Sequence, residues 1–367
     1  MAAEKQIFSN LPIPPGDFLA EVLAVKGISQ VELGRRMGRP AQAINEIIAG
    51  KKAITPDTAL QLERALGVPA SIWTGLESRF QLIKARQLET KQLKKDLTYL
   101  DQIPYRELAK MGFVKHSRNK IDRVRELHAF YGVSALANMT NVEAYAAAFR
   151  CSRNKDASPY ALAAWLKSSE MQAGEIVTKS FLKEHLQACL SKIRGFILEP
   201  VEEIEEKLQS TLADCGIAFV LMPHLPRTYA HGATFWLNPE KAVIVKSIRG
   251  RWADIFWFSL FHEIAHIFLH NKRAIFIDDD DAAPDLIKEE KEADEFAARL
   301  LIPQNELQTF LKTCEINENS IQELSHRLGV IPGIVIGRLQ HDGYLRQDTR
   351  LNKLRFRLAW NTQANQI

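Results

Sequence analysis

The sequence has few cysteines and no long apolar run, and each absence argues against a class of protein. Only four cysteines occur in 367 residues, none in a CxxC pair, which argues against a disulfide framework or a cysteine-based metal module. No apolar run approaches the roughly 20 residues of a membrane-spanning helix, and residues 1–10 lack the apolar core of a signal peptide. We therefore expect a cytoplasmic protein with reduced thiols at Cys151, Cys189, Cys215 and Cys314.

Charge is abundant but unevenly distributed along the chain. Hydrophobic residues make up 46% of the sequence and charged residues 25%, which predicts a soluble globular chain of two or three domains. The net charge of +4 is the balance of a basic end and an acidic region. Residues 1–130 hold 21 Lys and Arg against 14 Asp and Glu, whereas residues 199–305 hold 11 against 19. The basic end favours a polyanionic partner.

The most informative stretch is an HExxH motif that begins at His262. On a helix, residues four apart share a face, so His262 and His266 can offer both imidazoles to one metal ion. Glu263 stands beside the first ligand and can take a proton from a water on the metal. The flanks from Ile255 to Leu269 are almost entirely apolar, which predicts a buried helix. The alternative is a structural helix whose histidines hydrogen-bond locally.

A second helix is predicted downstream, between residues 289 and 303, because its apolar residues repeat at helical spacing. Catalytic zinc usually takes three protein ligands and a water, so this acidic helix is the place to look for the third ligand. Glu290 and Asp294 are four apart and share a face. We expect Glu290 to be the third ligand and Asp294 to accept the outer N–H of a ligand histidine. Glu292 is the rival ligand, and Glu289 is a weaker one.

Four segments of this region resemble the ImmA/IrrE family of zinc metallopeptidases: 232–237, 242–247, 256–263 and 290–303. The resemblance implies a zincin-like domain in which His262, His266 and Glu290 bind Zn²⁺ and Glu263 is the general base. It also implies a protein substrate, since the known substrates of this family are helix-turn-helix repressors.

Two short β-rich runs, 234–237 and 243–245, flank a turn pattern that begins at Asn238 and predict a hairpin. An edge strand beside the metal helix would hold an extended peptide by main-chain pairing. Tyr229 and His231, just before the hairpin, are candidates to stabilise the oxyanion.

A different pattern occupies the amino end. Ser29 and Glu32 match a capping box, with the Ser29 side chain capping a helix and Glu32 reaching back. Gly38 can end this helix, and a second short helix follows from Pro40, with isoleucines on one face and amide side chains on the other. A further helix starts at Thr55. Two short helices joined by a tight turn predict a helix-turn-helix, the alternative being an ordinary small helical bundle.

Residues 12–82 resemble the Xre/Cro family, and within it the HigA-type antitoxins. The resemblance implies a five-helix domain that binds an inverted-repeat DNA operator as a homodimer. Gln and Asn can pair with the adenine edge in the major groove, whereas Glu46 has either a structural role or a contact to a cytosine edge. The residues implied to contact bases or phosphates are Gln30, Arg39, Gln42 and Asn45, and those implied to contact phosphates are Lys51 and Lys52.

The remaining segments complete the expected architecture. Residues 82–120 are charged and predict a connecting helix followed by a loop, and residues 123–189 read as helical without identifiable chemistry. They resemble the middle region of long Xre–ImmA/IrrE fusions. Residues 320–339 again suggest helix, turn, helix, but the second half is too apolar to face DNA, which favours a structural role. We expect a mainly α fold with a small β-sheet (α+β), divided at 1–82, 83–198, 199–345 and 346–367.

Two functions fit these patterns. The first is a transcriptional regulator with a built-in zinc metallopeptidase that cleaves a repressor, a toxin or other partner, or itself, with the stretch 82–120 as the expected site of self-cleavage. The second is a non-proteolytic antitoxin or repressor whose peptidase-like domain only senses a metal or a partner.

Overall fold

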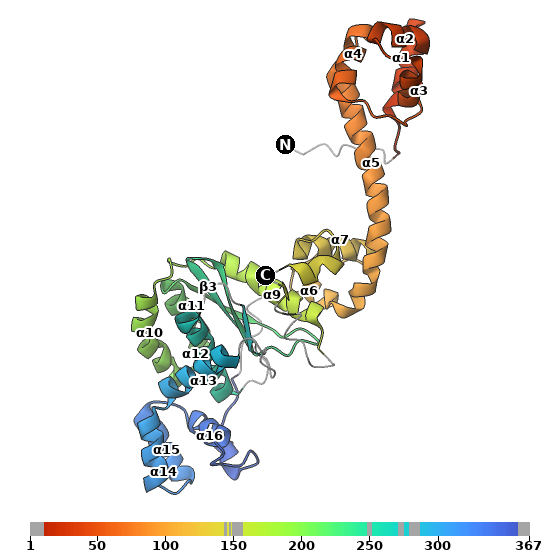
Figure 1. Cartoon of the computed structure of the whole chain (residues 1–367). Coiled ribbons are helices and arrows are strands. Elements are labelled where there is room, and N and C mark those ends of the chain that lie inside the picture. The colour runs from red at the N-terminus through yellow and green to blue at the C-terminus, as the bar shows by residue number, and fades with distance from the viewer. Residues whose placement is uncertain are drawn as a thin grey trace. The chain divides into compact units, whose positions relative to one another are not determined.

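The computed structural model describes residues 11–142, 145–146, 148, 157–247, 252–270, 275–278 and 287–358. Contacts divide the chain into two compact units, residues 1–95 and 96–367. Both units are mainly helical, and the second also contains a four-stranded sheet (Figure 1). The α+β fold class expected from the sequence is therefore confirmed. The sequence-based domain boundaries stay predictions.

The first unit has five helices among its described residues, the last of which reaches the start of the second unit: α1 (Pro15–Lys26), α2 (Gln30–Met37), α3 (Ala41–Ile48), α4 (Pro56–Leu66) and α5 (Ala70–Asp96). The Ser29 side chain accepts the Glu32 N–H at 3.1 Å, so α2 begins where expected. The other half of the capping box was predicted wrongly. The Glu32 carboxylate contacts Arg36 at 3.0 Å instead, because an arginine one turn further along offers it a charged partner. Gly38 ends α2 in the left-handed conformation, with φ of 63°.

The core of the first unit explains how α3 is oriented. Ile44 and Ile47 are buried against Leu33 of α2 and Leu62 of α4. The expected inward isoleucine face is therefore confirmed. Because one face of α3 is occupied by this core, the side chains on its other face remain in solvent.

The sheet of the second unit has the order β1-β3-β2-β4. Its strands are β1 (Ile217–Met222), β2 (Gly232–Asn238), β3 (Lys241–Ser247) and β4 (Phe276–Asp278). The β2–β3 hairpin is antiparallel, as the turn pattern predicts, and β1 pairs with β3 in parallel. On its other side β2 pairs with β4, at residues 232–234. Among the described strands, β1 and β4 are the edges.

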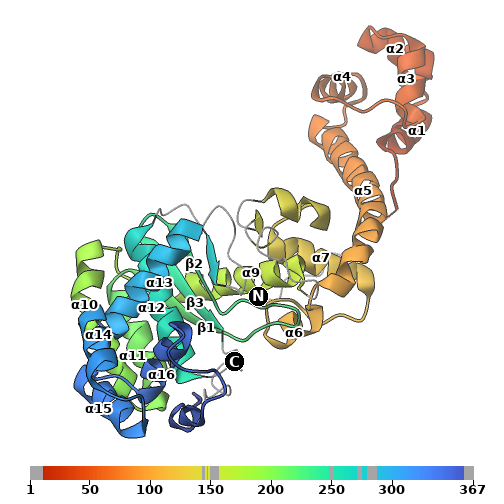
Figure 2. The ribbon, with the colours of Figure 1, turned by 60° about the horizontal axis from the view of Figure 1, so that its bottom comes forward.

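Both faces of the sheet are covered by helices (Figure 2). Alternate side chains of β1 point to opposite faces: Phe219 joins one core and Val220 the other. The helices on the Val220 side precede the sheet in the chain and share a core with it: α6 (Tyr105–Lys110), α7 (Lys120–Tyr131) and α9 (Pro159–Glu175), with the 3-10 helices η1 (Leu97–Gln102) and η2 (Leu136–Asn141). The opposite face is covered by α10 (Lys183–Gly195), η3 (Phe196–Leu198), α11 (Val201–Asp214) and the metal-motif helix α12 (Ala253–Leu269).

The last helices close the domain over α12. They are α13 (Ile287–Leu301), α14 (Gln304–Thr313), α15 (Glu318–Leu328) and α16 (Pro332–His341), followed by η4 (Arg350–Leu354). Residues 334–336 of α16 are buried, which confirms the structural role expected for this segment. Gly337 lets α16 approach α12 closely, since a Cβ there would lie 3.2 Å from an oxygen of Asp254. That carboxylate is also bound by Arg355, at 2.7 and 3.2 Å.

The charged stretch 82–120 is more regular than expected. Helix α5 continues to Asp96, and η1 and α6 follow within the next fifteen residues. A run of Leu, Lys and Gln without Pro or Gly extends the helix. Non-helical chain, as expected for self-cleavage, is therefore limited in this stretch to residues 103–104 and 111–119.

Two further observations concern the described residues. No helix among them is long and apolar enough to cross a bilayer. Cys189, Cys215 and Cys314 are free thiols, while Cys151 lies outside the described residues.

Candidate metal centre and recognition helix

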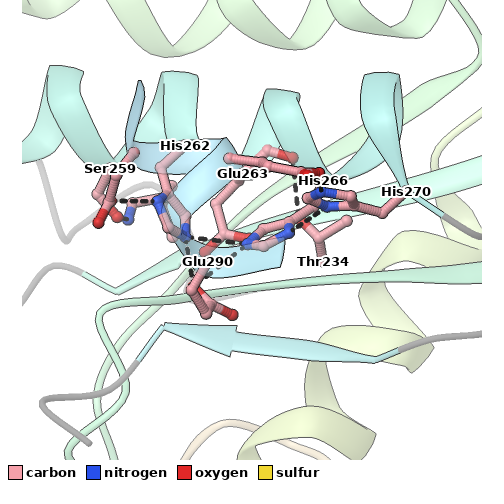
Figure 3. A network of polar contacts seen from close by, with 10 residues as sticks. Thr234, Ser259, His262, Glu263, His266, His270 and Glu290 are labelled. Atoms are coloured by element: carbon pink, nitrogen blue, oxygen red, sulfur yellow. Dashed lines mark hydrogen bonds and ion pairs between the residues drawn. The ribbon is translucent and has the colours of Figure 1, made fainter. Parts of the chain in front are cut away.

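Helices α12 and α13 bring three candidate metal ligands together (Figure 3). The Nε2 atoms of His262 and His266 lie 2.9 Å apart, because the two residues are one helical turn apart on α12. Oε2 of Glu290, on α13, lies 2.9 Å from Nε2 of His262 and 3.6 Å from Nε2 of His266. Among the described residues, this trio is the group of His, Cys, Asp and Glu side chains that could hold a metal ion.

The trio fits a zinc ion in both geometry and charge. Tetrahedral zinc with bonds of 2.0–2.1 Å spaces its ligand atoms about 3.3 Å apart, and the three contacts here bracket that value. Burial lowers the pKa of His266, against a hydrogen bond with Glu290 that raises it. Burial alone would raise the pKa of the Glu290 carboxyl, but hydrogen bonds from His262 and His266 outweigh it and hold that pKa at about 2. A neutral imidazole and a carboxylate are the forms that bind metal.

The outer nitrogen of each histidine has its own partner. Oδ1 of Asp294 lies 2.9 Å from Nδ1 of His262, the contact that the sequence predicts. The Asp294 carboxylate accepts a hydrogen bond from Nδ1–H, so in a metal-bound state His262 would keep its hydrogen on Nδ1 and direct the Nε2 lone pair at the ion. Nδ1 of His266 lies 3.0 Å from Nδ1 of His270, whose Nε2 is 3.2 Å from Oε2 of Glu292. With His270 donating to Glu292, its Nδ1 accepts from His266 and fixes the same tautomer.

This arrangement separates the two rival acidic residues of α13. Glu290 reaches the histidine pair, whereas Glu292 reaches His270 and, at 3.7 Å, Lys288. Glu289 is not part of the trio either. His270 was not predicted as a site residue, although it is the third histidine in a series at four-residue intervals on one helix face.

Glu263 is fully buried beside the trio. Its Oε2 accepts a hydrogen bond of 2.6 Å from the hydroxyl of Thr234 on β2. A Cβ on Gly232 would lie 2.3 Å from Oε1 of Glu263, a distance that real Cβ atoms do not adopt. Glycine at this position therefore gives the carboxylate its place against the sheet.

Lys246 of β3 is buried at the same place. Its ammonium is hydrogen-bonded to the hydroxyl of Ser259, one turn before His262, and lies 2.9 Å from the position of a Cβ on Gly232. The ammonium and the Glu263 carboxylate thus flank the same glycine. Lys246 and Thr234 lie in two of the segments that resemble the metallopeptidase family, 242–247 and 232–237, and were not predicted as site residues.

A cavity of about 660 Å³ lies beside the trio, and His262 and Asp294 form part of its wall. His231, one of the two oxyanion candidates, lines it too. Tyr229 is half-buried and is not among the lining residues.

In the first unit, the polar face of α3 carries the expected contact residues. Gln42 and Asn45 are exposed, and the Gln42 amide donates to the Glu46 carboxylate at 3.1 Å. The Glu46 carbonyl accepts the backbone N–H groups of Lys51 and Lys52, at 2.9 and 3.1 Å. Glu46 therefore orients its neighbours, which is the structural alternative left open by the sequence.

The other predicted DNA contacts differ in exposure and in their hydrogen-bond partners. Lys51 and Lys52 are exposed between α3 and α4, and Gln30 is half-buried at the first residue of α2. Arg39 donates through Nε to the Gln61 side chain of α4 at 2.7 Å. The Nε–H group of Arg39 is thus used in a hydrogen bond within the domain.

Comparisons with known proteins cover both ends of the chain. A helix-turn-helix family model matches residues 19–73, and an IrrE N-terminal-like domain model matches residues 255–340. Virulence-associated protein I of Dichelobacter nodosus is 36% identical over 76 residues, which are 20% of this chain and 70% of that protein. The chain belongs to the helix-turn-helix family. Its carboxyl-terminal part is an IrrE-like domain, a metallopeptidase-like fold.

Two further matches fall on the helix-turn-helix unit. The uncharacterised HTH-type transcriptional regulator YddM of Escherichia coli (strain K12) is 29% identical over 73 residues, 20% of this chain and 78% of that protein. A solved structure of the Pseudomonas aeruginosa antitoxin HigA with the higBA promoter is 31% identical, covering 23% of this chain and 95% of that one, with a TM-score of 0.22.

Proposed function

We propose that this helix-turn-helix protein is a transcriptional regulator with a built-in zinc-dependent metallopeptidase that cleaves a repressor, a partner protein or itself. The observation that carries the proposal is the trio of His262, His266 and Glu290, with the Glu263 carboxylate beside it. Two imidazoles, one carboxylate and an adjacent unligated glutamate are the parts of a hydrolytic zinc site.

Each residue of the site has a defined task in peptide hydrolysis. Bound Zn²⁺ would supply Lewis acidity toward water and toward the scissile carbonyl. Glu263 accepts the proton of the attacking water and returns it to the leaving amine. Thr234 holds one oxygen of that carboxylate by a hydrogen bond of 2.6 Å. His231, which lines the adjacent cavity, is the better placed of the two candidates for the oxyanion.

The first unit would bind the DNA operator. In a helix-turn-helix domain the second helix of the motif lies in the major groove, which makes α3 the recognition helix, with Gln42 and Asn45 toward base edges. Lys51 and Lys52 would contact phosphates. We expect a homodimer on an inverted repeat whose half-sites lie about 34 Å apart, one turn of DNA. A toxin or a repressor is the expected protein partner.

One observation favours a second candidate, a repressor or antitoxin whose peptidase-like domain only senses metal or a partner. Glu263 has no exposed surface and its carboxylate is hydrogen-bonded within the domain. A general base needs access to water, so this conformation must open for turnover.

A cleavage assay on the purified full chain tests the proposal. Zinc-loaded wild type and Glu263→Gln would be incubated with a proteome-derived peptide library, and new termini would be identified by mass spectrometry. Cleavage by wild type alone, with equal zinc in both proteins, supports the peptidase. Equal cleavage profiles, or none from either protein, favour the sensor.

A further inference from the structure

The buried ammonium of Lys246 has no task in the hydrolysis proposed above. Lysine is almost never fully buried unless it is paired, yet the side chain of Lys246 is 2% exposed. Its Nζ donates to the hydroxyl of Ser259 on α12. A neutral hydroxyl satisfies one of the three N–H donors but does not compensate the charge. An ammonium in this position needs an anionic neighbour.

The pairing of β2 with β3 shows which carboxylate is that neighbour. Lys246 is the cross-strand partner of Gly232, and side chains of such a pair lie side by side on one face of the sheet. Because Gly232 has no side chain, the space next to Lys246 is open to a group from α12. Glu263 takes this space: a Cβ on Gly232 would lie 2.3 Å from its Oε1 and 2.9 Å from Nζ of Lys246. Opposite charges this near to one point attract strongly where water is excluded.

The Glu263 carboxylate is also held from β2. Thr234 is two residues after Gly232 and so lies on the same face of the sheet. Its hydroxyl donates to Oε2 of Glu263 at 2.6 Å (Figure 3). Glu263 has no exposed surface in this position, whereas a general base must exchange protons with water. The groups that hold the carboxylate therefore also separate it from solvent.

We propose that Lys246 is the counter-ion of Glu263 and retains its carboxylate in this closed position, so that release of Glu263 from Lys246 precedes turnover. Lys246 acts through Glu263 and is a positioning residue. The pairing of the two charges is independent of the proposed peptidase function. Its consequence for turnover rests on that function and adds a means of regulating it.

Chemical labelling of carboxylates tests the closed position without requiring turnover. The zinc-treated full chain would be reacted with a water-soluble carbodiimide and glycine methyl ester, and the modified residues would be followed by mass spectrometry. Lys246→Met removes the charge and keeps the length of the side chain. Glu263 should then be labelled at least about tenfold faster, because a buried carboxylate that has lost its counter-ion is strongly destabilised. Equal labelling rates in wild type and Lys246→Met would overturn the proposal.

Lys241→Met is the matched control on the same strand. The Lys241 ammonium donates to the Ile176 carbonyl, so its loss should leave the labelling of Glu263 as in wild type. Asp254, buried and bound by Arg355, is the reference carboxylate within the same unit. Its labelling should stay slow in Lys246→Met.

If Asp254 is labelled faster as well, Lys246→Met has lost its fold and melting temperatures decide. Lys246→Met should lower the melting temperature, and the added change Glu263→Gln should raise it again, because an amide needs no counter-ion. A double variant that melts no higher than Lys246→Met contradicts the pairing.

Cleavage of library peptides separates this inference from the function on which its consequence rests. With equal zinc content, Lys246→Met should show a higher kcat than wild type, because a larger fraction of the enzyme has an open base. A lower kcat together with fast labelling means that Lys246 assists the reaction, and the restraint is disproved. Wild type that cuts no peptide, with labelling and melting as expected, disproves the peptidase and leaves the pairing. Cleavage by wild type with equal labelling in both proteins disproves the pairing and leaves the peptidase.

Discussion

The recognition helix α3 and the metal helix α12 present their polar residues in opposite ways. On α3, Gln42 and Asn45 are exposed. On α12, the exposed fractions of His262, Glu263 and His266 are 5%, 0% and 2%. Amide side chains on the surface can hydrogen-bond to a binding partner such as DNA, and their exposure has little effect on the stability of the fold. Buried imidazoles and carboxylates must be held by other polar groups, so each one depends on a network around it.

The largest effect is expected from removing a buried candidate metal ligand. His262→Ala or His266→Ala should take the zinc content from about one per chain to near zero, because two remaining ligands hold zinc weakly. Glu290→Ala should lose metal as well. Glu292→Ala is the matched control on the same helix and should retain zinc, since Glu292 contacts His270 and not the trio. Elemental analysis of the purified proteins measures this; full zinc in both histidine variants would refute the site.

Replacing the proposed general base should separate zinc binding from peptide cleavage. Glu263→Gln keeps the shape of the side chain, and we expect zinc to remain while peptide cleavage falls by about 10²–10⁴-fold. Cleavage rates on the best library peptide, normalised to zinc content, give the effect. A variant as active as wild type would show that Glu263 is not the base.

A smaller change tests the packing under Glu263. Gly232→Ala would place a Cβ 2.3 Å from Oε1 of Glu263, so the carboxylate or the strand must shift. We expect a loss of stability of about 1–3 kcal/mol, with zinc retained and cleavage reduced. Gly174→Ala is the control, since a Cβ there meets nothing within 4 Å and the change in a helix should stabilise the protein by about 1 kcal/mol. In denaturant unfolding, the free energy of unfolding should therefore fall for Gly232→Ala and rise for Gly174→Ala.

On the exposed side of the comparison, single substitutions should act only on DNA. Gln42→Ala and Asn45→Ala should each cost about 1–3 kcal/mol of specific binding and relax sequence preference, with stability unchanged. Competition binding against operator variants measures the relaxation. If both variants keep the sequence preference of wild type, α3 does not contact the bases.

The smallest effect is expected at Lys52. Lys52→Ala should weaken all DNA sequences alike and reduce the slope of log affinity against log salt by about one. A salt titration on operator and random DNA measures both quantities. Selective loss of operator binding would mean that Lys52 contacts a base.

The sequence predicted contacts between residues of one helix, but it did not predict contacts that form only when distant elements pack together. His262 and His266 were paired correctly because one helix holds both, and the contact of Asp294 with His262 follows from a four-residue spacing on α13. Lys246 and Thr234 reach Glu263 only through the packing of the sheet on α12, which no local pattern contains. Strand β4 was not predicted because it has only three residues, Phe276–Asp278, too few to show alternation.

The bond between Asp254 and Arg355 spans 101 positions of the chain. During synthesis from the amino end, the helix-turn-helix unit is complete long before Arg355 leaves the ribosome, and its contacts are local. The first turn of α12, by contrast, gains its arginine partner only when residue 355 has been made. A nascent chain can thus hold a finished recognition helix while the helix that carries the HExxH motif is still without that partner.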